Sequence, residues 1–131
     1  MKTPIILLRI AGTISLLFML FHCAFYKIFQ WNTALSCLSQ LNLSIMLTYH
    51  FISILITGFM GFITLFQAKT LLNSPLKYSI LGMFSLFFLI RIITEFSLFT
   101  GVHSVIISVI IISLCAIPVI FYMIALFYKS K

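Results

Sequence analysis

Four long apolar runs, separated by short polar breaks, make up most of the chain. Each run exceeds the roughly 20 residues that a helix needs to cross a hydrocarbon core of about 30 Å. Polar residues recur in these runs every three or four positions, which is the period of one helix face. We therefore predict an all-α protein, a single transmembrane domain over residues 1–131. It is expected to form an integral membrane bundle of four antiparallel transmembrane helices, at approximately 5–29, 42–66, 76–99 and 104–128.

The polar breaks carry the residues expected between membrane helices. Trp31, in the first break, is placed as an interfacial anchor. Pro75 suits the first turn of a new helix, and Gly101 is the expected terminator of the third. Because the link around Gly101 is short, the third and fourth helices are predicted to be antiparallel neighbours. Pro118 is expected to kink the fourth.

Small and polar residues form one stripe on each of the first two predicted helices. Gly12 and Ser15 belong to the first stripe, and Thr57, Gly61 and Thr64 belong to the second. Membrane helices use such residues to approach one another closely. We expect these stripes to face the interior of the bundle.

Composition places most of the surface against lipid. Hydrophobic residues make up 63% of the chain and charged residues 7%, against about 25% charged in an average globular domain. A soluble domain of this size could not hide so much apolar surface, because small domains bury only about 60–70% of what they expose unfolded. The net charge of +7 sits mainly at the ends of the runs, so it indicates topology and lipid head groups, and nucleic acid is not an expected partner.

Basic residues also predict the orientation. If the chain crosses four times, one side carries most of them, namely Lys2, Arg9, Lys69, Lys77, Lys129 and Lys131. The other side has Lys27. By the positive-inside rule, both termini are expected in the cytoplasm.

A candidate site is predicted in the outer half of the bundle. Glu95 is the only acidic residue and follows Arg91 by one helical turn. A rise of about 1.5 Å per residue puts His22 roughly 10 Å, His50 and Arg91 roughly 12 Å and Glu95 about 6 Å below the outer surface, with His103 at the rim. The inner half shows no comparable group. Ionisable residues inside a membrane usually mark a functional site.

Several interpretations of this cluster remain open. Arg91 and Glu95 can be a structural pair. The cluster can also bind a lipid, quinone or other small amphiphile, with Arg91 on an anionic or carbonyl group and His22 and His50 as hydrogen-bonding partners. Metal or haem ligation by His22 and His50 with Glu95 or His103 is a third interpretation, although no ligand pair occurs within one helix. The remaining interpretations are a small transporter and an accessory or assembly subunit of a larger membrane complex. The sequence does not identify which cofactor, if any, the protein uses.

Enzymatic chemistry has no visible motif. Cys23 follows His22 directly and so points about 100° away on a helix, which does not make a Cys–His pair. Cys37 and Cys115 show no metal or redox spacing. We expect the cysteines to be free, with a Cys23–Cys37 disulfide as the alternative in an oxidising compartment.

A loose resemblance covers most of the chain. Leu8-Arg9-Ile10-Ala11-Gly12, then Phe21-His22, Phe25, Phe29-Gln30-Trp31 and Leu35-Ser36-Cys37-Leu38-Ser39, resembles small uncharacterised four-helix bacterial membrane proteins. The Arg91, Glu95 and Phe96 positions are compatible with it. The resemblance implies a multi-pass protein of the bacterial inner membrane and no particular activity.

Overall fold

Four long helices occupy the apolar runs. The computed structural model describes residues 2–99, 101 and 104–128, and this part of the chain contains helices and no strand. The long helices are α1 (Lys2–Ile28), α3 (Gln40–Phe66), α5 (Lys77–Leu98) and α6 (Val105–Phe127). All four are long and apolar enough to cross a membrane. The chain is therefore all-helical over the part described, and its composition fits a membrane protein.

Local hydrogen bonds define where the helices begin and end. Ser39 and Ser104 precede α3 and α6, and each serine oxygen accepts a bond from a backbone N–H in the first turn, at 3.4 Å. Such caps satisfy donors that have no partner within the helix. Gly101 follows α5 with a φ of 78°, a conformation that glycine adopts without strain.

Two polar breaks contain short helices that the hydrophobic pattern did not predict. These are α2 (Trp31–Ala34) and α4 (Ala68–Asn73). In α4, Ala68, Leu71 and Leu72 are buried against α1 and α3. The sequence pattern does not predict α4, because its apolar face is too short to give a periodic signal.

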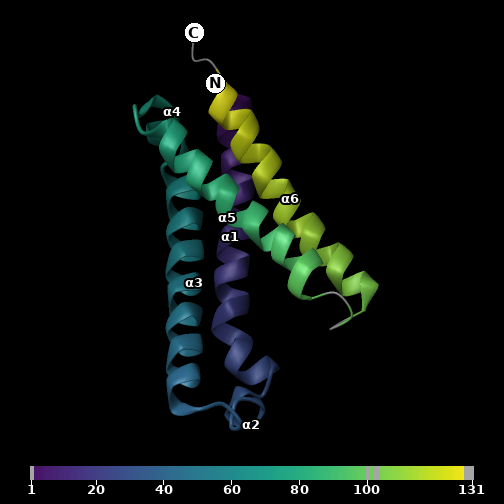
Figure 1. Ribbon diagram of the computed structural model, residues 1–131. Coiled ribbons are helices and arrows are strands. Elements are labelled where there is room, and N and C mark those ends of the chain that lie inside the picture. Colours follow the sequence, from purple (N-terminus) through teal and green to yellow (C-terminus); the bar gives the residue numbers. More distant parts are fainter. Residues whose placement is uncertain (1, 100, 102–103, 129–131) are drawn as a thin grey trace.

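The long helices form two pairs that are inclined to each other. Figure 1 shows α1 and α3 as one pair and α5 and α6 as the other, with α1 also packed on α6. The start of α1, the end of α6 and the whole of α4 lie at one end of the molecule, which we call the terminal end. At the other end, which we call the distal end, the α2 region and the end of α5 lie well apart.

Burial follows the same geometry. The buried residues of α1 stop at Ser15, and those of α3 begin only at Thr57. On α6, the buried positions run from Cys115 to Ala125. The close-packed core thus occupies the terminal half of the molecule, and the two pairs diverge toward the distal end.

Two glycines form a close backbone contact in the core. A Cβ atom added at Gly12 would lie 2.7 Å from the backbone nitrogen of Leu65 and 3.0 Å from the carbonyl oxygen of Gly61. One added at Gly61 would lie 2.6 Å from the Leu16 side chain and 3.0 Å from the Gly12 carbonyl oxygen. The backbones of α1 and α3 meet here, which we call the glycine seam.

Candidate functional site

A hollow of about 240 Å³ lies where the two helix pairs begin to diverge. Each long helix contributes to its wall. The polar side chains that line it are His22 of α1, Ser53 and Thr57 of α3, and Arg91 and Thr94 of α5. Its apolar wall includes Phe18, Phe87, Phe88, Ile90 and Cys115. We call this space the polar hollow.

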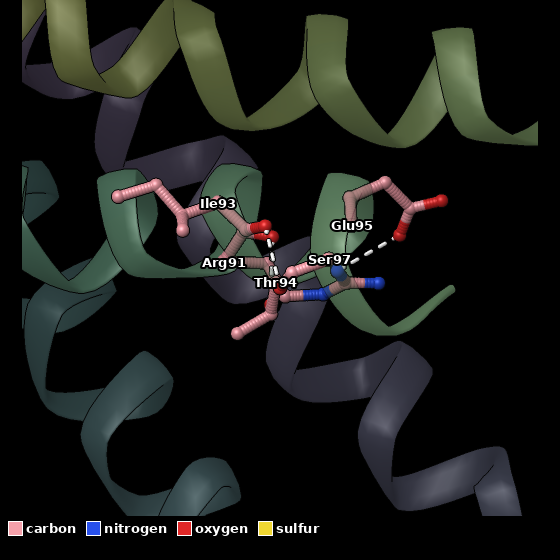
Figure 2. Close-up of polar contacts among 5 residues, drawn as sticks. All are labelled: Arg91, Ile93, Thr94, Glu95 and Ser97. Atoms are coloured by element: carbon pink, nitrogen blue, oxygen red, sulfur yellow. Dashed lines mark hydrogen bonds and ion pairs between the residues drawn. The ribbon is translucent and has the colours of Figure 1, made fainter. Parts of the chain in front are cut away.

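The Arg91 side chain on the wall of the polar hollow forms an ion pair within α5. Arg91 Nη1 is 2.8 Å from Glu95 Oε2, one helical turn apart, and Figure 2 shows the guanidinium alongside the carboxylate. Glu95 is buried, whereas about a third of the Arg91 side chain is exposed. The guanidinium also lies over the Phe99 ring, 4.9 Å from its centre. Arg91 therefore balances a buried carboxylate while part of its own side chain stays accessible.

The hydroxyl groups of the polar hollow donate to their own helices. Ser53 donates to the Tyr49 carbonyl at 2.9 Å, and Thr57 donates to the Ser53 carbonyl at 2.7 Å. Thr94 donates to the Arg91 carbonyl at 2.9 Å, a bond that Figure 2 includes. Since each hydroxyl hydrogen is already used, each oxygen has lone pairs left to accept a hydrogen bond from a ligand.

His22 has one ring nitrogen bonded within α1. Its Nδ1 lies 2.8 Å from the Phe18 carbonyl oxygen. A carbonyl only accepts, so Nδ1 carries the hydrogen, and in the neutral ring Nε2 is then an acceptor. The ring is half-buried and lines the polar hollow.

His50 belongs to an aromatic cluster beside the polar hollow and does not line it. Its ring centre lies 5.9 Å from that of His22, 5.4 Å from that of Phe25 and 4.7 Å from that of Trp31. Of the five predicted site residues, His22 and Arg91 therefore line the polar hollow. Glu95 adjoins it through its ion pair with Arg91. His50 touches it only through His22, and His103 lies outside the described residues.

No metal site is evident in the part of the chain that the structure describes. These residues contain no group of three or more His, Cys, Asp or Glu side chains close enough to hold an ion. The His22 and His50 rings are stacked, with an interplanar angle of 28°. Cys23 and Cys37 are exposed and Cys115 is buried, all as free thiols.

A second, wholly apolar space adjoins the first. It measures about 430 Å³ and lies between α1 and α6. Its walls are Ile14, Leu17, Phe18 and Phe21 on α1 and Ile107, Ile110, Ile111 and Leu114 on α6. We call it the apolar groove. Phe18 lines both spaces, and its ring packs against Phe88 with centres 5.7 Å apart.

The terminal half holds a polar contact that sequence reasoning missed. Ser15 Oγ and Tyr122 Oη lie 3.1 Å apart, both fully buried, and Thr64 is a second partner of the tyrosine. In the sequence, Ser15 and Thr64 belong to the stripes expected to face the interior, and no hydrogen bond between them and the fourth helix was predicted. The available signal was the helical spacing of Cys115, Pro118, Tyr122 and Ala125, all of which are buried on the largely apolar α6.

No protein-family model, curated protein or solved structure matches this chain.

Proposed function

We propose that the chain is a multi-pass membrane protein whose four long helices cross the bilayer in alternating directions. Their length and apolar composition support this. Lys2, Lys69 and Lys77 come from segments at the terminal end, and Lys27 comes from the distal end (Figure 1). With the positive-inside rule, this distribution favours a cytoplasmic terminal end in a bacterial inner membrane.

The function that the geometry supports best is binding of a small amphiphile, such as a lipid or a quinone, at the polar hollow. The observation that carries this proposal is the convergence of His22 and Arg91, from two helix pairs, on one hollow with apolar walls. Small-molecule sites combine such walls with a few polar groups that fix orientation. Ionisable residues within membrane helices face such sites or other protein.

Each polar group has a role in this proposal. Arg91 offers hydrogen-bond donors to the head of the amphiphile, because its pair with Glu95 is formed through Nη1 and the guanidinium has further N–H groups. His22 is a second hydrogen-bonding partner. Glu95 positions Arg91 and balances its charge, which lowers the energetic cost of burying the guanidinium at this depth.

The proposal is tested by filling the polar hollow. Ser53 lines it, whereas Ser44 is exposed on the same helix. Ser53→Leu and the control Ser44→Leu are purified in mild detergent beside the wild type, and native mass spectrometry measures bound small molecules. We expect a bound amphiphile in the wild type and in Ser44→Leu, and its loss in Ser53→Leu. Circular dichroism checks that both variants are folded.

A further variant examines the charged group. Arg91→Ala is expected to release the amphiphile, and also to destabilise the protein because the buried Glu95 carboxylate loses its partner at 2.8 Å. Ser53→Leu is therefore the decisive comparison. A wild-type protein with no bound molecule, or equal occupancy in the two leucine variants, would refute binding at this site.

A further inference from the structure

The charge balance of the polar hollow bears on the kind of head group it can take. Arg91 is already paired with Glu95 at 2.8 Å, so the pair adds no net charge. A phosphate or carboxylate head would place a second negative charge near the buried Glu95, in surroundings where like charges repel strongly. The polar hollow therefore favours an uncharged head.

Hydrogen bonding narrows the head further. Ser53, Thr57 and Thr94 have committed their hydrogens to backbone carbonyls, and His22 has committed its Nδ1 hydrogen. These four side chains therefore present hydrogen-bond acceptors to a ligand. Arg91 presents donors. A hydroxyl group both accepts and donates through one oxygen, whereas a ketone or an ether can only accept.

The sizes of the two spaces indicate where the rest of the molecule lies. The polar hollow, at about 240 Å³, is smaller than the roughly 300–1,000 Å³ of typical ligand sites. It has room for a head and not for a long chain. The apolar groove, at about 430 Å³, meets the same Phe18 ring and has only hydrocarbon side chains on its walls. A chain that passes Phe18 would enter it.

We propose that the amphiphile is uncharged, carries a hydroxyl head and has a single hydrocarbon chain. The head lies in the polar hollow between Arg91 and His22, and the chain lies in the apolar groove, with Phe18 at the junction. This inference rests on the proposed function and specifies the ligand class of the same site.

Photo-crosslinking tests both parts of the inference. The probe is dodecan-1-ol with a diazirine in its chain, applied to the protein in lipid nanodiscs, and labelled peptides are located by mass spectrometry. Competitors are unlabelled dodecan-1-ol, its methyl ether and dodecanoate. Ile110→Phe narrows the apolar groove, and Ile106→Phe is the matched control because Ile106 is exposed on the same helix outside the groove.

We expect labels on the segments of α1 and α6 that line the apolar groove. Unlabelled dodecan-1-ol should reduce labelling at about tenfold lower concentration than its methyl ether, because the ether has no O–H group to donate to the acceptors of the polar hollow. It should also outcompete dodecanoate. Labelling should fall in Ile110→Phe and stay at the wild-type level in Ile106→Phe.

The contrary outcomes separate the two proposals. Equal or better competition by the ether or by dodecanoate would overturn the hydroxyl head, while binding at the site would stand. Equal labelling of Ile110→Phe and Ile106→Phe would overturn the placement of the chain. Labelling that no competitor reduces, and that Ser53→Leu leaves unchanged, would overturn the proposed function and this inference with it.

Discussion

Replacing Gly12 by alanine should separate α1 from α3 at the glycine seam. The added methyl carbon would lie 2.7 Å from the Leu65 backbone nitrogen and from the Thr64 hydroxyl oxygen, and 3.0 Å from the Gly61 carbonyl oxygen. Two of these three neighbours are backbone atoms, so no change of rotamer can relieve the contact. The helices themselves have to move.

The expected magnitude follows from two opposing effects. Overpacking a core by one methyl group costs about 1–3 kcal/mol, and the rigid backbone neighbours place Gly12 at the upper end. Alanine gains about 1 kcal/mol over glycine in helix propensity. The net loss in free energy of unfolding is therefore about 2 kcal/mol. Gly82→Ala is the control: its added Cβ has no heavy-atom neighbour within 4 Å, so only the gain of up to about 1 kcal/mol applies.

The measurement is reversible unfolding in mixed detergent micelles, followed by the fluorescence of Trp31, the single tryptophan. Its ring packs on Phe25 of α1 and His50 of α3, so its emission should change when this pair separates. We expect the unfolding midpoint to fall for Gly12→Ala and to hold or rise for Gly82→Ala. Equal shifts in the two variants would mean that α1 and α3 do not meet at Gly12.

Three shorter predictions address other parts of the molecule. Ser15→Ala and Tyr122→Phe should each lower the free energy of unfolding by about 0.6 kcal/mol or more. Because the two side chains contact each other, the loss in the double variant should differ from the sum of the single losses, and additive losses would disprove the contact. Lys77→Met should speed amide hydrogen exchange at the end of α6, because Lys77 Nζ donates a hydrogen bond of 3.0 Å to the carbonyl oxygen of Tyr128, the residue after this helix. An unchanged exchange rate would refute this. A membrane-impermeant maleimide should label exposed Cys37 from outside the cell and spare buried Cys115. Labelling of Cys37 only after lysis would reverse the proposed orientation.

The hydrophobic pattern predicted the four long helices, because runs of this length and composition have few alternatives. The small-residue stripes also indicated a close approach of the first two helices, and Gly12 and Gly61 do meet. The inclination of the two helix pairs could not be predicted. It depends on how complete surfaces pack, whereas periodicity reports only which face of one helix is polar.

The candidate site shows the same limit. Counting residues along each helix gave the level of His22 and His50, and their rings lie within stacking distance. It could not give the direction of each side chain around the bundle. His50 consequently lies among Phe25 and Trp31, whereas Thr57, assigned in the sequence to a packing stripe, lines the polar hollow.

The division of polar groups between the two halves has one physical cause. At the glycine seam α1 and α3 touch through backbone atoms. The Ser15 and Tyr122 side chains buried in this half carry neutral hydroxyls that contact each other. An ion pair is costly to bury there. Where the helix pairs diverge, Arg91 keeps partial exposure beside the polar hollow, and the pair becomes tolerable.

The glycine seam should therefore set the shape of the polar hollow. Phe18 and His22 lie further along α1 from Gly12, on the part of the helix that would be displaced if the seam opened. Gly12→Ala should thus lower occupancy by the bound amphiphile as well as stability, and Gly82→Ala should lower neither. Native mass spectrometry of the two variants, at a temperature where both are folded, measures this. Full occupancy in folded Gly12→Ala would show that the seam holds the helices together without shaping the site.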